Sequence, residues 1–107
     1  MTLQEKQILL AEFLGFKTFI RGKDTVCIGD YEKDGDKIVK FDSDWNWIMQ
    51  VVEKIEKLYH LHGVRIEGKW CYIITNKNFD VRAETKLEAV FEACVQFVEW
   101  YNKNKLK

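Results

Sequence analysis

Proline is absent from this 107-residue chain, and Ser43 is its only serine. Without proline, the ends of helices and strands must be read from glycine, aspartate and asparagine. The six glycines are scattered singly, which excludes the glycine-rich loops that hold phosphates. The serine has no Gly-X-Ser-X-Gly motif around it. It lies between Asp42 and Asp44, a pattern typical of a helix N-cap.

Cysteine is scarce and odd in number. Cys27, Cys71 and Cys94 have no short paired spacing, so they do not form a disulfide framework. Each lies in an apolar run, where a free cysteine behaves as a small hydrophobic residue. This usage indicates a reducing compartment, the cytoplasm.

Neither sign of charge is in excess, because 17 basic and 17 acidic residues give a formal net charge of zero. Nucleic-acid-binding proteins usually carry a basic surplus, so the balance argues against a nucleic-acid partner. No apolar stretch approaches the roughly 20 residues of a membrane-spanning helix. The first ten residues also lack the regions of a signal peptide. We therefore expect a cytoplasmic protein with no membrane contact.

The chain contains enough apolar material for one core. It is 47% hydrophobic and 14% aromatic, and its length fits one domain that buries roughly two-thirds of its unfolded surface. We expect a single α+β domain at residues 1–102, followed by a basic, solvated tail at residues 103–107.

Three segments have the apolar periodicity of helices: residues 3–14, 44–59 and 85–102. Thr2 and Glu5 have the spacing of a capping box at the start of the first helix, and Thr85 and Glu88 have it at the start of the third. Gly15 follows the first helix, where a left-handed residue is favoured. Helical structure is therefore predicted with defined ends.

Four segments are strand-like: residues 25–29, 37–41, 64–67 and 70–74. Asp34-Gly35 predicts a hairpin turn between the first two, and Gly68-Lys69 a type II′ turn between the others. Shorter extended pieces at residues 17–20 and 79–81 are ambiguous. The resulting order is α-ββ-α-ββ-α, an antiparallel sheet of about four strands packed with three helices.

The turn at Gly68-Lys69 fixes the register of the second hairpin. The predicted pairs are Glu67 with Trp70, Ile66 with Cys71, Arg65 with Tyr72, and Val64 with Ile73. Because paired residues share a face, one face of the hairpin is wholly apolar and packs on helices. The other face mixes aromatic and charged residues, and is either partly covered or available to a partner.

The two histidines, His60 and His62, do not have the spacing of a metal site. A helical zinc pair is usually four residues apart. These two lie near a helix C-terminus, where the dipole favours positive charge. We expect no metal and no cofactor.

The acidic stretch at residues 30–36 resembles the start of a calcium loop, with oxygen-bearing residues at positions one, three and five and glycine at six. However, Lys37 occupies position eight, and Phe41 stands where the bidentate glutamate belongs. A charged hairpin tip is the preferred interpretation, and ion binding there stays open.

Several carboxylates are present, but they match a solvated helix face rather than an acid–base pair. They are Glu84, Glu88, Glu92 and Glu99. Acid–base work requires burial that shifts a pKa, and the sequence does not indicate it. A nucleophile with an adjacent base is not found either. We expect a protein that is not an enzyme.

The aromatic residues are the candidates for an interaction surface. Trp45 and Trp47 point about 200° apart on the second helix, and Trp100 lies one position off the stripe of the third. The mixed hairpin face presents Trp70 and Tyr72, with Arg65 beside them. Such residues are common at interface hot spots, while the alternative is broad core packing. The interaction candidates are Trp45, Trp47, Arg65, Trp70, Tyr72 and Trp100.

Three blocks of the chain resemble a group of short uncharacterised proteins of gut bacteria, their prophages and mobile elements. The blocks are residues 11–15 (AEFLG), 44–56 (DWNWIMQVVEKIE) and 85–102 (TKLEAVFEACVQFVEWYN). This group is similar to the phage ABA-sandwich domain. The resemblance implies an antiparallel sheet between helices and implies no catalytic or ligand-binding residues.

Together these features predict a small protein–protein interaction module, binding an unknown protein partner or itself. The alternative is a nucleic-acid-binding accessory protein, in which Trp70 and Tyr72 stack on bases and Arg65 and Lys69 supply positive charge.

Overall fold

The computed structural model describes residues 1–29, 37–58, 63–74 and 77–104. It contains three helices and two three-stranded antiparallel sheets in the order α-βββ-α-βββ-α. The elements are α1 (Leu3–Phe13), β1 (Thr18–Arg21), β2 (Thr25–Ile28), β3 (Lys37–Ile38), α2 (Trp45–Leu58), β4 (Gly63–Glu67), β5 (Trp70–Ile74), β6 (Asn78–Arg82) and α3 (Lys86–Asn104). We call β1–β2–β3 the first sheet and β4–β5–β6 the second sheet.

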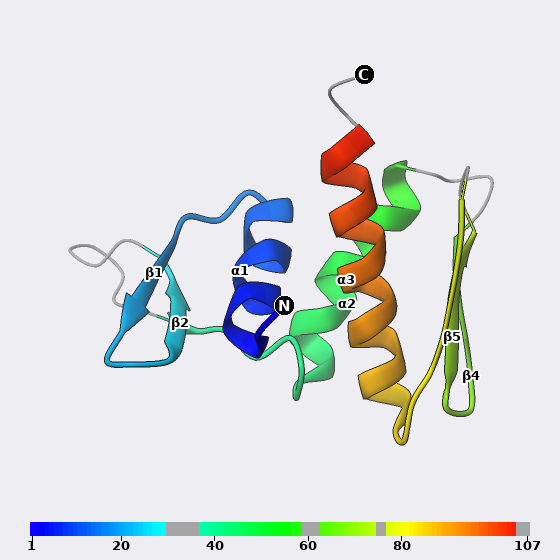
Figure 1. Ribbon diagram of the computed structural model, residues 1–107, viewed down its shortest axis with the longest axis horizontal. Coiled ribbons are helices and arrows are strands. Elements are labelled where there is room, and N and C mark those ends of the chain that lie inside the picture. The colour runs from blue at the N-terminus through cyan, green and yellow to red at the C-terminus, as the bar shows by residue number, and fades with distance from the viewer. Residues whose placement is uncertain (30–36, 59–62, 75–76, 105–107) are drawn as a thin grey trace.

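The helices lie between the two sheets (Figure 1). Helix α1 packs against β1 and β2 of the first sheet and against α3. Helix α3 contacts α1, α2 and all three strands of the second sheet, and α2 packs on α3 and β4. Helix α3 is therefore the central element of the fold, and eight of its side chains are buried.

The α+β class and the three helices are confirmed, but the arrangement of strands differs from the predicted single sheet of about four. The ambiguous pieces at residues 17–20 and 79–81 are the strands β1 and β6, which add a third strand to each hairpin. Because α1 and α3 pack directly on each other, the two sheets lie on opposite sides of the helices. The sheet-between-helices arrangement that the resemblance implies is thus reversed here.

The second hairpin has the predicted register. Glu67 pairs with Trp70, and the pairing continues to Gly63 and Ile74 at the other end. Gly68 has a φ of 54°, while Lys69 is not among the residues with positive φ, as a type II′ turn requires. The pattern of turn and alternation was therefore sufficient to predict which side chains share a face.

Helix α1 has the predicted ends. Thr2 and Glu5 form a capping box. At the other end, Phe16 N–H donates to the Ala11 carbonyl and Gly15 N–H to the Glu12 carbonyl, both at 3.0 Å. This pair of bonds is the Schellman motif. Gly15, with a φ of 91°, adopts the left-handed conformation that the motif needs.

Helix α3 extends two residues beyond its predicted end. Lys103 and Asn104, which we assigned to the solvated tail, are helical, and Asn104 Nδ2 donates to the Trp100 carbonyl at 2.7 Å. The rest of the tail, the two histidines and the acidic stretch at residues 30–36 with its Asp34-Gly35 turn lie outside the described residues. Within the described part of the chain, no helix has the length and hydropathy needed to cross a membrane.

Candidate functional site

The second sheet has one covered face and one open face. Its covered face is apolar and packs on the core that surrounds α3. The opposite face, here called the outer face, has no described helix or strand against it (Figure 1). From the strand register, its residues are Gly63, Arg65, Glu67, Trp70, Tyr72, Ile74, Asn78, Asp80 and Arg82.

An aromatic pair forms the centre of the outer face. The rings of Trp70 and Tyr72, both partly buried, have centroids 4.5 Å apart and planes tilted by 43°. The Cζ atom of Arg82 lies 5.0 Å from the centroid of the Trp70 ring, within the range of a cation–π contact. Trp70 Nε1 donates a hydrogen bond to Asp80. These contacts hold the indole in one orientation.

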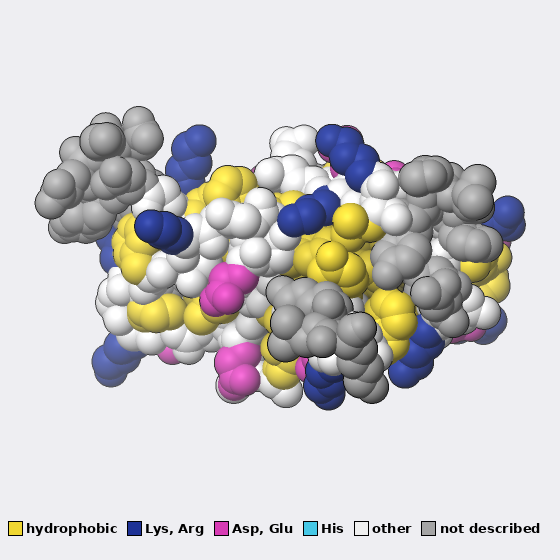
Figure 2. All heavy atoms as spheres, turned by 90° about the horizontal axis from the view of Figure 1, so that it is seen from above, with side chains coloured by type: hydrophobic (Ala, Val, Ile, Leu, Met, Phe, Trp, Pro, Cys, Tyr) yellow, Lys and Arg dark blue, Asp and Glu magenta, His cyan; other side chains and the backbone are white. Residues whose placement is uncertain are grey.

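The charges of the outer face cancel. Arg65 and Glu67 on β4 and Asp80 and Arg82 on β6 are all exposed, and they comprise two positive and two negative groups. An aromatic centre with a charged, solvated rim is the usual anatomy of a protein-binding surface. Elsewhere, Figure 2 shows Lys and Arg side chains distributed around one side of the molecule rather than gathered into a basic patch.

The six candidate residues do not form one surface. Arg65, Trp70 and Tyr72 share the outer face. Trp45 begins α2 and is 39% exposed, while Trp47 packs edge-on against Phe41 with ring centroids 5.4 Å apart. The pair on α2 thus divides into one exposed and one partly buried tryptophan, as their angular separation predicts.

Trp100 belongs to the covered side of the second sheet. Its ring centroid lies 5.8 Å from that of Phe79 and 6.0 Å from that of Phe97. It is partly buried against the core. A residue in this position stabilises the packing of α3 on β6, so Trp100 is separate from the outer face.

Asp80 and Arg82 were absent from the candidate residues, although both contact Trp70. They were missed because β6 was only an ambiguous strand in the sequence. The signal was nevertheless present: Asn78-Phe79-Asp80-Val81-Arg82 alternates polar and apolar residues, the period of a strand with one buried face.

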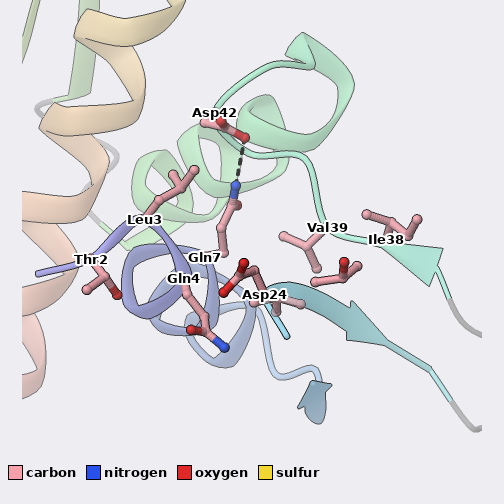
Figure 3. Close-up of a pocket in the computed structure, with 10 residues that line it drawn as sticks. Thr2, Leu3, Gln4, Gln7, Asp24, Ile38, Val39 and Asp42 are labelled. Carbon is pink, nitrogen blue, oxygen red and sulfur yellow. Dashed lines mark hydrogen bonds between the residues drawn. The ribbon is translucent and has the colours of Figure 1, made fainter. Parts of the chain in front are cut away.

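A cleft of about 540 Å³ lies on the opposite half of the molecule, between α1, β2 and the segment before α2. Gln7 contributes to its wall and points toward Asp42 (Figure 3). Gln7 Nε2 donates to Asp42 Oδ1 at 2.7 Å, and Phe41 N–H donates to Gln7 Oε1 at 3.1 Å. Both polar groups of this buried amide therefore form hydrogen bonds that join α1 to the segment before α2, so Gln7 stabilises the fold.

Two buried thiols lie between the second sheet and α3: Cys71 on the covered face of β5 and Cys94 on α3. Burial raises the pKa of the Cys71 thiol to about 12. Burial, and to a smaller extent the nearby Cys71, raises the pKa of the Cys94 thiol well above its ordinary value. Since the thiolate is the reactive form, burial at both positions favours the unreactive neutral thiol at neutral pH. Among the described residues, no group of three or more His, Cys, Asp or Glu side chains is arranged to hold a metal ion.

Comparison of the chain with family models, curated proteins and solved structures finds no match. The outer face must therefore be interpreted from its own geometry.

Proposed function

We propose that this chain is a small cytoplasmic protein-binding module of the phage or mobile-element type, acting without catalysis, and that the outer face of the second sheet binds its partner. The observation that carries the proposal is a tryptophan–tyrosine pair held in fixed orientation on a sheet face that no described element covers. Trp and Tyr are enriched among the residues that dominate binding energy.

Pre-organisation supports this assignment. Arg82 stacks on the Trp70 ring, and Asp80 accepts from its indole N–H. A side chain already fixed in the free protein loses less conformational entropy when a partner binds. The outer face therefore presents a rigid anchor instead of a flexible aromatic side chain.

The charge pattern favours a protein over a nucleic acid as the partner. Arg65 and Arg82 could contact phosphates, but Glu67 and Asp80 lie on the same face in equal number. Phosphate binding depends on uncompensated positive charge. We accordingly expect no mobility shift of single-stranded RNA or DNA at low salt.

The buried thiols support the other parts of the proposal. Cys27, Cys71 and Cys94 are buried and are thiols rather than halves of disulfides, as is usual for a protein in a reducing compartment. The raised pKa values of Cys71 and Cys94 also argue against a thiolate-based reaction.

Photo-cross-linking at the centre of the outer face tests the proposal. We would replace Tyr72 by a benzophenone amino acid in the organism that makes the protein, with the same replacement at exposed Glu53 on α2 as the matched control. The expected result is a discrete protein adduct from position 72 that is absent from position 53. No adduct at position 72, or an adduct to nucleic acid, would overturn the proposed function.

A further inference from the structure

Four residues on the edge strands of the outer face carry charges in a chequerboard. Along β4, Arg65 is followed by Glu67, and along β6, Asp80 is followed by Arg82. The register places Arg65 and Asp80 at one level of the sheet, on either side of β5, and Glu67 and Arg82 at the next level. Opposite signs therefore lie across each level and along each edge strand.

The charge pattern is self-complementary: when the outer face of a second copy is laid on it, opposite charges meet. A two-fold axis parallel to β5, between two facing sheets, sets each level against the same level of the other copy and exchanges the edge strands. Arg65 then faces Asp80 of the second copy, and Glu67 faces Arg82 of the second copy. Two-fold symmetry repeats both contacts, so all four charged residues meet an opposite charge.

We propose that the partner of the outer face is a second copy of this chain, packed sheet to sheet about a two-fold axis parallel to β5. The inference rests on the proposed function, because it names the partner of the same face. Facing sheets pack about 10 Å apart, a gap that Trp70 and Tyr72 of both copies fill. Aligned sheets cross at about −30°, so the axis would lie about 15° from each β5 strand, a small angle that keeps the facing charged residues within reach of each other.

A two-fold axis perpendicular to the strands is less favourable. It would set Arg65 against Glu67 of the second copy and Asp80 against Arg82 of the second copy. For those contacts the axis must pass between the two charged levels, which leaves the third level, that of Ile74, outside the overlap. The parallel axis overlaps all three levels and buries Ile74 against its own counterpart.

The size of the face predicts a weak dimer. Three strands of five residues cover roughly 14 Å by 17 Å, or about 240 Å² in projection. A standard interface buries about 800 Å² on each partner. We therefore expect a reversible dimer with a Kd on the order of tens to hundreds of micromolar.

Sedimentation equilibrium up to about 1 mM tests the inference with two double variants that keep the net charge at zero. In Glu67→Arg/Arg82→Glu, the exchanged charges still face each other across the parallel axis and only the Arg82 contact with the Trp70 ring is lost, so the Kd should rise by less than about fivefold. In Arg65→Glu/Glu67→Arg, both facing pairs become like charges, so the Kd should rise at least about tenfold. Circular dichroism and urea midpoints establish that both variants are folded.

Three outcomes would overturn the inference. A wild-type chain that stays monomeric at about 1 mM has no self-interface, and the proposed function is then judged separately by whether position 72 cross-links to another protein. A dimer that survives in both variants forms through another surface. The reverse ranking of the two variants places the copies about the perpendicular axis.

Discussion

Replacing Phe97 by alanine is expected to lower the free energy of unfolding by about 4 kcal/mol, the usual cost of deleting a fully buried aromatic ring. Phe97 has no exposed surface, and its ring lies 6.1 Å from that of Phe13 on α1 and 5.9 Å from that of Phe79 on β6. It thus joins the two halves of the fold through α3. The loss is a large part of the stability of a domain this small.

Urea denaturation of the variant and the wild type measures this effect. Phe16→Ala is the matched control, because it deletes the same ring from a side chain that is 37% exposed and should cost less than about 1 kcal/mol. Phe97→Leu, which keeps most of the volume, should cost less than Phe97→Ala and ensures a folded variant for comparison. Equal costs at positions 97 and 16 would show that Phe97 is not the link between the two halves.

A steep loss of stability is expected at alkaline pH. In the folded chain burial raises the pKa of Cys71 to about 12, and burial, together with the nearby Cys71, raises the pKa of Cys94 well above its ordinary value. An unfolded cysteine has a pKa near 8.5–9. Above that pH the unfolded chain releases two protons that the folded chain keeps, so the unfolded state is favoured as pH rises.

The stabilisation from the neutral thiols is complete below about pH 8.5 and is lost as the pH rises toward the folded-state pKa. The slope approaches about 1.4 kcal/mol per pH unit for each thiol. We expect a Cys71→Ala/Cys94→Ala variant, kept under reducing conditions, to lose that part of the slope between about pH 9 and pH 10.5.

Val90→Ala provides the control for the thiol experiment. It shortens a fully buried α3 side chain without removing a thiol, so it should lower stability equally at every pH and leave the slope unchanged. Urea midpoints measured across the pH series give the result. A double cysteine variant with the wild-type slope would contradict the assignment of the alkaline loss to these two groups.

The local elements of this fold were largely readable from the sequence, because their signals are local. The Thr2–Glu5 capping box, Gly15 and the Gly68-Lys69 turn each fix a geometry within a few residues, and all three structures are confirmed. The register of the second hairpin followed from its turn alone. Turn and cap chemistry therefore predicted helix ends and hairpin faces well.

The assembly of these elements was not readable in the same way. Two short strands, β1 and β6, are stabilised mainly by pairing with β2 and β5, a contact that periodicity within a short segment does not reveal. The division into two sheets depends on the direct packing of α1 on α3. Such long-range contacts between helix faces are not specified by any local pattern.

The candidate site was predicted in part for the same reason. Arg65, Trp70 and Tyr72 were assigned to one face because they belong to one hairpin. Asp80 and Arg82 complete that face from the third strand, and without them the indole has neither its hydrogen-bond acceptor nor its cation. The chequerboard of charges emerges only when all three strands are in register.

Hydroxyl-radical footprinting tests most directly whether a partner covers the outer face. Oxidation of Trp70 and Tyr72 would be compared between the purified chain at about 1 mM and the same chain at about 1 µM, with exposed Trp45 as the internal reference. Our account predicts that Trp70 and Tyr72 are protected at least about twofold relative to Trp45 at the high concentration, because a bound copy excludes solvent from the centre of the interface. Ratios of Trp70 and Tyr72 oxidation to Trp45 oxidation that are the same at both concentrations would contradict it.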